Sequence, residues 1–381
     1  MQIFAACSHG LGDIAAGELQ ELGFQTGSVH DAGVELTGAG ASEIVRLNLA
    51  ARTIFRVYIR LAETDVRSLD EITEFCSTVP FSDWFDAGQP FAIRGRREGD
   101  HDFTSMDVAR DVGSAVVEHF QRVKGKRIPV NLDEPEIEIH ANLKGTRLEL
   151  LLNTSGRSLD YRYHRPFQHF APLKPSIAAA LLRLSSCEAY GNLLDPMAGG
   201  GTIPIEAVLR ALRIAPGIYR KRDEYLYHHL RFIDPAIHES ETDKLQAGVL
   251  SNTQLNVMAA DRFIKNVAGI KLNTAHFGLQ PHIRVKQGLA ETLSYIEKGE
   301  YDCIATNPPF GMRIGSTKLT EQLYRNFAKA CADKEIREVM GLTPLKRTWI
   351  SSFMQNGYAI THSRIVHFGN LHVTFLKASL Q

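Results

Sequence analysis

The chain has 381 residues, of which 44% are hydrophobic and 23% charged, and this composition argues against a disordered, collagen-like or disulfide-rich protein. At roughly 150 residues per domain, the length favours two to three domains. No apolar run reaches the ~18 residues of a membrane span, and the N-terminus lacks the basic start of a signal peptide, so we expect a cytoplasmic protein without a membrane partner. The five cysteines have no metal-ligand spacing, which predicts reduced thiols and no metal site.

The formal charge sums to zero but is distributed unevenly along the chain. Residues 1–155 hold 15 Lys and Arg against 24 Asp and Glu, whereas residues 156–381 hold 28 against 19. This asymmetry favours separate modules, with a cationic face on the C-terminal one. Two basic clusters nevertheless lie in the acidic part, and each is either a nucleic-acid contact or an ordinary solvated face. They are Arg94, Arg96 and Arg97, and Arg122, Lys124, Lys126 and Arg127.

The first 155 residues alternate strand-like and helical patterns, which predicts two successive α/β units. The first unit has expected elements at Ile3–Ala6, Asp13–Leu22, Gly33–Leu36 and Ala41–Leu49. The pattern then restarts, with expected elements at Phe55–Leu61, Leu69–Cys76, Pro90–Arg94, Met106–Gln121, Glu136–Ala141 and Arg147–Leu152.

An aperiodic segment rich in Pro, Arg and aromatic residues, Ser155–Pro175, indicates a linker. Beyond it, strands and helices alternate as βαβ units of a mostly parallel sheet do. The expected units are Leu193–Asp195, Ile203–Leu212, Gln254–Asn266, Ile283–Lys286, Asp302–Thr306 and Glu321–Ala330. The C-terminal pattern predicts an antiparallel hairpin formed by Tyr358–Phe368 and Leu371–Lys377.

The stretch LLDPMAGGGTIPIEA runs from an apolar strand through an acid and a glycine turn into a helix. Glycines let the backbone approach a ligand, and a helix N-terminus presents free N–H groups with a partial positive charge. Such a turn can also join a strand to a helix without any ligand. However, the acid at the strand end, Asp195, would repel a phosphate and attract a cationic amino acid moiety. The stretch therefore suits S-adenosylmethionine better than a nucleotide.

A second apolar strand ends in the turn Asn307-Pro308-Pro309-Phe310, which its two prolines make rigid. The exocyclic amine of a nucleobase is a poor nucleophile, and two acceptors on its N–H bonds favour a tetrahedral nitrogen. Asn307 Oδ1 and the Pro308 carbonyl can supply those acceptors, and Phe310 can stack on an extruded base. A tight turn with a buried Phe is the structural alternative, which becomes less plausible beside the glycine turn.

Together, DPMAGGGTIPIEA and NPPFG resemble the THUMP-domain RNA methyltransferases, which methylate the N2 amine of guanosine in tRNA or ribosomal RNA. HGLGDIAAGELQELG, KGKRIPVNLDEPEIEIHANL and SGRSLDYRYHR are similar to the N-terminal modules and linker of that family. The resemblance implies an α/β fold with a ferredoxin-like domain (1–58), a THUMP domain (59–155), a linker (156–175) and a Rossmann-like class I methyltransferase domain ending in an antiparallel hairpin (176–381). It also implies S-adenosyl-L-methionine as cofactor, structured RNA as partner, and a monomer.

The resemblance implies a set of cofactor-binding residues, with Pro172 and Leu173 beside the methionine moiety. The others in the matching motif are Asp195, Pro196, Ala198, Gly199, Gly201, Thr202 and Glu206. At two further cofactor positions the family has acids at strand ends, where this chain has Asn252 and Leu289, unless Glu291 takes the second place. The expected RNA contacts are Arg94, Arg96, Lys124, Lys126 and Arg127, with Arg220 and Arg222 from a basic, aromatic segment.

Two alternatives remain beside guanosine-N2 methylation. The first is an adenine-N6 methyltransferase acting on RNA or DNA, because the NPPF turn recognises an amine and not a particular base. The second is a non-catalytic RNA-binding factor on a degenerate methyltransferase fold, because the neutral Asn252 and Leu289 would hold a cofactor less strongly than carboxylates.

Overall fold

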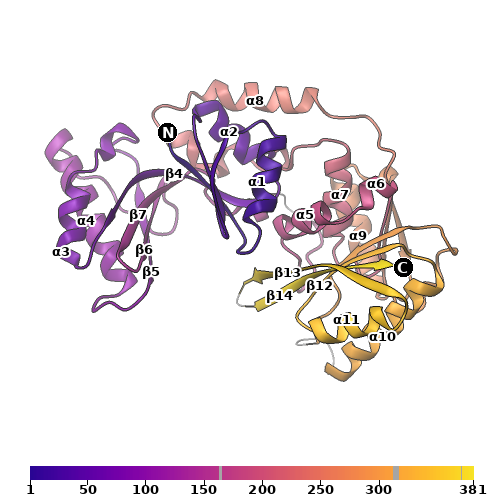
Figure 1. Ribbon diagram of the computed structural model, residues 1–381. Helices are drawn as coiled ribbons and strands as arrows, with labels where there is room; N and C mark the ends of the chain where they lie inside the picture. Colours follow the sequence, from indigo (N-terminus) through magenta and orange to yellow (C-terminus); the bar gives the residue numbers. More distant parts are fainter. Residues whose placement is uncertain (163–164, 312–316, 370) are drawn as a thin grey trace.

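The computed structural model describes residues 1–162, 165–311, 317–369 and 371–381, which fold around two seven-stranded sheets (Figure 1). One sheet belongs to the N-terminal part of the chain, and the other to the C-terminal part. The predicted mixed α/β class is confirmed, and so is the order of N-terminal modules followed by a Rossmann-like domain.

The N-terminal sheet has the strand order β2-β3-β1-β4-β7-β6-β5. Its longest strand, β4, pairs with β1 through its first half and with β7 through its second half. The two N-terminal modules therefore share one continuous sheet, and the expected boundary at residue 58 falls inside β4. The strands are β1 (Ile3–Cys7), β2 (Thr26–His30), β3 (Gly33–Leu36), β4 (Ile54–Asp65), β5 (Phe91–Glu98), β6 (Ile137–Lys144) and β7 (Arg147–Asn153).

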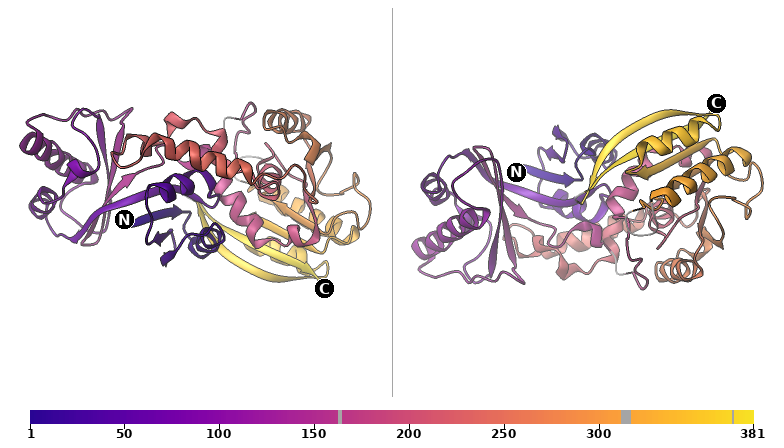
Figure 2. Two further views of the ribbon diagram at one scale, coloured as in Figure 1. Left: turned by 90° about the horizontal axis from the view of Figure 1, so that it is seen from above. Right: turned by 90° about the horizontal axis from the view of Figure 1, so that it is seen from below.

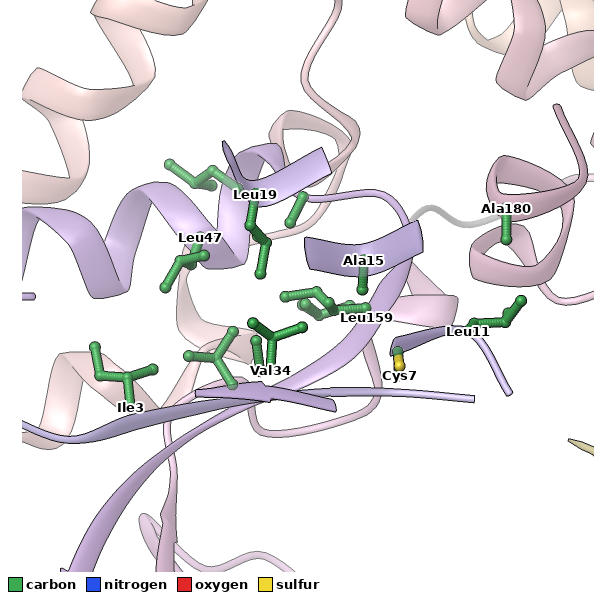
Figure 3. Close-up of a cluster of buried hydrophobic side chains, with 14 of the residues drawn as sticks. Ile3, Cys7, Leu11, Ala15, Leu19, Val34, Leu47, Leu159 and Ala180 are labelled. Atoms are coloured by element: carbon green, nitrogen blue, oxygen red, sulfur yellow. The ribbon is translucent and has the colours of Figure 1, made fainter. Parts of the chain in front are cut away.

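Four helices accompany this sheet: α1 (Gly12–Glu21), α2 (Ala41–Ala50), α3 (Leu69–Ser77) and α4 (Ser105–Lys124). Helix α4 begins with a capping box between Thr104 and Asp107. Buried side chains of β1, β3, α1 and α2 pack together, and Figure 3 shows Leu159 and Ala180 beside them. Because these two residues follow the N-terminal modules in sequence, the core of the first module continues into the rest of the chain.

The C-terminal sheet has the strand order β10-β9-β8-β11-β12-β14-β13. Strands β8 to β12 are parallel, and β13 and β14 form the predicted hairpin, whose first strand has the predicted bounds. Chain order reverses between β8 and β11, and ligands of open α/β sheets bind at the carboxyl ends of strands at such a switch point. The strands are β8 (Asn192–Asp195), β9 (Asn256–Asp261), β10 (Ile283–Gln287), β11 (Cys303–Thr306), β12 (Glu338–Thr343), β13 (Tyr358–Phe368) and β14 (Leu371–Leu380).

Seven α-helices lie in this part of the described chain, together with short 3₁₀ turns. The helices are α5 (Pro175–Leu184), α6 (Cys187–Tyr190), α7 (Thr202–Ala211), α8 (Pro235–Ala247), α9 (Ile264–His276), α10 (Thr317–Asp333) and α11 (Lys346–Met354). The two views of Figure 2 show helices on both faces of the sheet. The 3₁₀ turns along the chain are Phe81–Asp83, Leu159–Tyr161, Pro216–Tyr219, Arg222–Glu224, Leu226–His229 and Gln280–His282.

A disulfide joins Cys187 of α6 to Cys303 at the start of β11. The expectation of reduced thiols is therefore wrong for this pair and holds for Cys7, Cys76 and Cys331, which are free and buried. The two bonded cysteines lie 116 positions apart, so their spacing carried no signal. They meet because α6 leads into β8, and β8 pairs with β11.

Candidate functional site

The glycine turn lies at the switch point, between the end of β8 and the start of α7. Gly199 and Gly201 have φ angles of 57° and 82°, a left-handed conformation that favours glycine. The Gly199 N–H donates a hydrogen bond of 3.0 Å to Asp261 Oδ2 at the end of β9. The backbone thus turns sharply between two carboxylates, those of Asp195 and Asp261.

Asp195 is buried at the end of β8, as its place in the motif predicted. Its Oδ1 accepts hydrogen bonds from the Thr306 hydroxyl at 2.7 Å and the Met197 N–H at 3.2 Å. Burial raises the pKa of Asp195 to about 7, and the negative charge of Asp261 acts in the same direction. The carboxyl group is therefore poised to ionise when a cation arrives beside it.

A small cavity of about 50 Å³ opens between Asp195, Asn307 and the glycine turn. Its other wall comes from the end of the linker, where it includes His169, Pro172 and Leu173. Of the expected cofactor residues, Pro172, Leu173, Asp195, Ala198, Gly199 and Thr202 line this cavity together.

The linker segment 165–173, here called the strap, is fastened over the glycine turn by polar and apolar contacts. Arg165 donates a hydrogen bond of 2.8 Å to the Thr202 hydroxyl. Asn273 of α9, fully buried, exchanges two hydrogen bonds of 3.0 Å with the backbone of Phe167 and donates a third, of 2.9 Å, to the Gly200 carbonyl. The Phe167 ring lies against Gly269 so closely that a Cβ there would overlap it. The strap is therefore part of the cavity wall.

A larger, mostly apolar cavity of about 980 Å³ adjoins the small one and is lined by Asn307, Pro308, Pro309 and Phe310. Its size lies at the upper end of the range for small-molecule sites. Asn307 lines both cavities, and its Oδ1 is buried without a hydrogen-bond partner in the described chain. The Tyr324 hydroxyl donates a hydrogen bond of 3.1 Å to the Pro309 carbonyl and so helps to hold the turn. The four residues predicted to address the target amine therefore lie together at one wall.

Asn252 lies away from this site, and its expected place at the end of the second strand is wrong. It is exposed in the loop before β9, whereas the end of β9 carries Asp261, which is 6% exposed and lines the large cavity. Asp261 Oδ1 accepts hydrogen bonds from the Phe263 N–H at 2.9 Å and Asn266 Nδ2 at 3.0 Å. The acid expected at this strand end is thus present, nine positions further along the chain.

Leu289 follows β10 as expected, but it is 41% exposed and lies outside both cavity walls. The large cavity is lined instead by the next residues, Ala290 and Glu291. Glu291 forms an ion pair of 3.5 Å with Arg262. The alternative that Glu291 takes the place of the family acid therefore fits the loop better than Leu289 does.

Glu206, expected to hold the cofactor, lines neither cavity. Its side chain is fully buried, 3.6 Å from Arg52 of the first module and 3.6 Å from Arg162 of the linker. The carboxylate instead joins α7 to the N-terminal part of the chain. Pro196 and Gly201 also lie outside the cavity walls, and a Cβ on Gly201 would contact Ile270.

The expected RNA contacts divide into buried, paired and exposed side chains. Arg220 is 6% exposed and donates hydrogen bonds to the carbonyls of Ser155, Arg157 and Glu224, so its predicted RNA contact is wrong. Arg222 and Arg94 are partly exposed but form ion pairs with Glu239 and Glu138. Arg96 on β5, Lys124 at the end of α4, and Lys126 and Arg127 in the segment after α4 are exposed as well.

Among the described residues, no group of three or more His, Cys, Asp or Glu side chains is arranged to hold a metal ion. In the same part of the chain, no helix is long and apolar enough to cross a membrane. Sequence reasoning missed Asp261 and the strap contacts of Phe167, His169 and Asn273. The signal for Asp261 was an apolar run ending in an acid, the same pattern as that of Asp195.

Three family models match the chain, and together they cover most of it. Residues 162–374 match the RMKL-like methyltransferase domain, residues 66–153 the THUMP domain, and residues 2–58 the RlmL ferredoxin-like domain. The first match alone spans more than half of the chain.

Similar proteins match this chain over nearly its whole length. A tRNA (guanine(6)-N2)-methyltransferase of Archaeoglobus fulgidus is 33% identical over 97% of this chain and 90% of its own length. The protein of the same name from Methanocaldococcus jannaschii is 31% identical over 97% of this chain and 98% of its own. Among solved structures, SMU.472 complexed with SAH superposes with a TM-score of 0.88 at 22% identity, covering 100% of this chain and 98% of that one.

Proposed function

The chain belongs to the family of RNA methyltransferases that carry the RMKL-like methyltransferase domain, and from this premise we propose that it methylates the N2 amine of a guanosine in tRNA. The methyl donor is S-adenosylmethionine. Two relatives that match nearly the whole chain are named for methylation of guanine 6 in tRNA, which favours tRNA over ribosomal RNA.

One observation carries the proposal: the buried Asn307 Oδ1 has no hydrogen-bond partner in the described chain and lies where the two cavities meet. A buried acceptor without a donor costs about 1–3 kcal/mol, so a ligand N–H is the natural partner for it. The exocyclic amine of guanine offers two N–H donors. An acceptor on the amine draws the nitrogen away from planarity and leaves its lone pair free to attack. After transfer, the nitrogen is acidic enough to lose its proton to water without a dedicated base.

The residues present also fit S-adenosylmethionine, which supplies an electrophilic methyl group when bound. The buried carboxyl group of Asp195 would hold the ammonium of the methionine moiety, and the N–H groups at the N-terminus of α7 would donate hydrogen bonds to its carboxylate. Asp261 would accept hydrogen bonds from the ribose hydroxyls, because it lines the large cavity. Glu291 is the acid closest in sequence to the expected adenine contact. These carboxylates support the proposal at the two positions where Asn252 and Leu289 were expected to bind the cofactor.

The N-terminal modules would grip the RNA through the exposed Arg96, Lys124, Lys126 and Arg127. Such residues neutralise phosphates and give RNA binding its salt dependence. A single copy carries the glycine turn, the NPPF turn and this basic surface, so the proposal needs only a monomer. A cytoplasmic location, where tRNA is available, is part of the same proposal.

Identification of the methylated nucleoside tests the proposal. Unmodified tRNA is incubated with the protein and labelled S-adenosylmethionine and is then digested to nucleosides. The methylated nucleoside is identified by mass spectrometry. We expect N2-methylguanosine with the parent chain and a loss of about 100-fold or more in rate with Asn307→Ala, whose cofactor affinity stays unchanged. N6-methyladenosine would establish the adenine alternative, and methylation of ribosomal RNA alone would replace tRNA as the substrate. No transfer together with no binding of S-adenosylhomocysteine would favour the non-catalytic factor.

A further inference from the structure

The tip of the C-terminal hairpin reaches from the methyltransferase sheet to the first N-terminal module (Figures 1 and 2). The two partners are distant in sequence. On β13, Arg364 forms an ion pair with Asp13 of α1 and donates a hydrogen bond of 3.0 Å to the Gly10 carbonyl. This contact holds the pKa of the Asp13 carboxyl below its usual value. Closer to the tip on the same strand, the His367 N–H donates a hydrogen bond of 3.1 Å to the His9 carbonyl.

Three histidine rings cover these backbone contacts. The ring of His9 stacks on that of His367 with centroids 4.5 Å apart, and His367 stacks on His372 of β14 at 4.3 Å. The first stack joins β13 to the loop after β1, and the second joins the two strands of the hairpin to each other.

Gly10 permits this close approach. Its φ of 90° is a left-handed conformation, and a Cβ at this position would overlap the carbonyl oxygen of Ile365. Gly23, at the end of α1, has a similar φ of 84°, but a Cβ there would meet nothing within 4 Å. The need for glycine at position 10 thus arises from backbone conformation and from contact with the hairpin, whereas at position 23 it arises from conformation alone.

Other residues of the same hairpin tip form part of the wall of the large cavity. Phe368, Gly369 and Leu371 line it beside the NPPF turn. The ring of Phe368 faces that of Phe310 edge-on, with centroids 6.4 Å apart and an interplanar angle of 84°. A base stacked on Phe310 would therefore lie within reach of Phe368.

We propose that the hairpin tip is a positioning element, through which the first N-terminal module holds Phe368 and Leu371 in the wall of the large cavity, where the target base would bind. The inference rests on the proposed function, which it deepens. It gives the N-terminal module a part in catalysis beside RNA binding, because the pocket wall is complete only while the loop after β1 holds the tip. Phe368 is expected to contact the base, whereas Gly10 and Asp13 act through the hairpin.

The substitution Gly10→Ala tests the proposal, with Gly23→Ala as the matched control for backbone strain. We expect Gly10→Ala to lower kcat for tRNA methylation by about tenfold to 100-fold, since a displacement of about 1 Å in a catalytic wall can cost that much. KM for tRNA and the affinity for S-adenosylhomocysteine should change little. Phe368→Ala should show the same loss in kcat, and the double variant should be no worse than Phe368→Ala alone. Asp13→Ala, a milder change at an exposed ion pair, should act in the same direction if Gly10→Ala folds poorly.

Hydrogen exchange of the amides of residues 365–369 and 371–373 gives a second readout, independent of turnover. We expect these amides to exchange at least about tenfold faster in Gly10→Ala than in Gly23→Ala, because opening of the tip no longer breaks the contacts with the first module. Equal kcat in the two glycine variants, or equal exchange, would overturn the positioning role. A parent chain that methylates no RNA would refute the proposed function, and hydrogen exchange would still decide whether the first module holds the tip.

Discussion

Replacement of Glu206 by alanine should damage the stability of the protein and leave cofactor binding intact. The side chain is fully buried, and the neighbouring side chains of Arg52 and Arg162 are no more than 10% exposed. Removal of one partner from a buried ion pair leaves an uncompensated charge and costs about 3–5 kcal/mol. This cost is a large part of the about 5–15 kcal/mol that stabilises a typical domain. The urea midpoint of Glu206→Ala should therefore fall well below that of the parent chain.

The assay combines urea unfolding with calorimetric titration of S-adenosylhomocysteine under conditions in which both chains are folded. Glu206→Gln serves as a second variant, because it keeps the shape of the side chain and removes only the charge. Unchanged stability combined with lost cofactor affinity would refute the reasoning. Such a result would mean that Glu206 reaches the cofactor, as the family motif implied.

Three further predictions concern the strap, the buried acid and the disulfide. Gly269→Ala should displace the half-buried Phe167 ring and weaken S-adenosylhomocysteine binding about fivefold to 30-fold, which corresponds to about 1–2 kcal/mol of lost apolar burial. Unchanged affinity in calorimetry would exclude the strap from the cofactor site. The pKa of Asp195 is raised to about 7, so its carboxylate is protonated below neutral pH, and the affinity of the parent chain for S-adenosylhomocysteine should fall there by up to about tenfold per pH unit. Asp195→Asn should show no such fall, and parallel plots of affinity against pH for the two chains would contradict the role of Asp195. Thiol titration of the unfolded chain should find three thiols before reduction and five after it, whereas five at the outset would show that Cys187 and Cys303 are not bonded.

Local sequence was sufficient where a turn and its chemistry are adjacent in the chain. Asp195 and Asn307 each follow an apolar strand and precede a turn formed by glycine or proline, and both line the small cavity. The hairpin at the C-terminus was also predicted from a local pattern, two strand-like segments that adjoin one short turn. In these cases the residues that form the turn also determine which side chain emerges at the strand end.

The errors arose where a residue's partners are distant in sequence. Asn252 was placed by the family resemblance, although the buried run before Asp261 marks the true strand end. The basic, aromatic surroundings of Arg220 suggested RNA contact, but its guanidinium satisfies carbonyl groups of the linker. Glu206 followed the family motif, while its true partners lie in another module and in the linker. Composition and spacing do not specify which face of a helix or turn another module will cover.

Methylation of a tRNA that lacks a single amino group tests the central claim most directly. Inosine differs from guanosine only in having no exocyclic amine, so a transcript with inosine in place of the methylated guanosine retains the remaining contacts with the protein. The account predicts that this tRNA still binds and receives no methyl group, beside full transfer to the unsubstituted transcript. Equal transfer to both would show that the acceptor is not the N2 amine and would contradict the role assigned to Asn307.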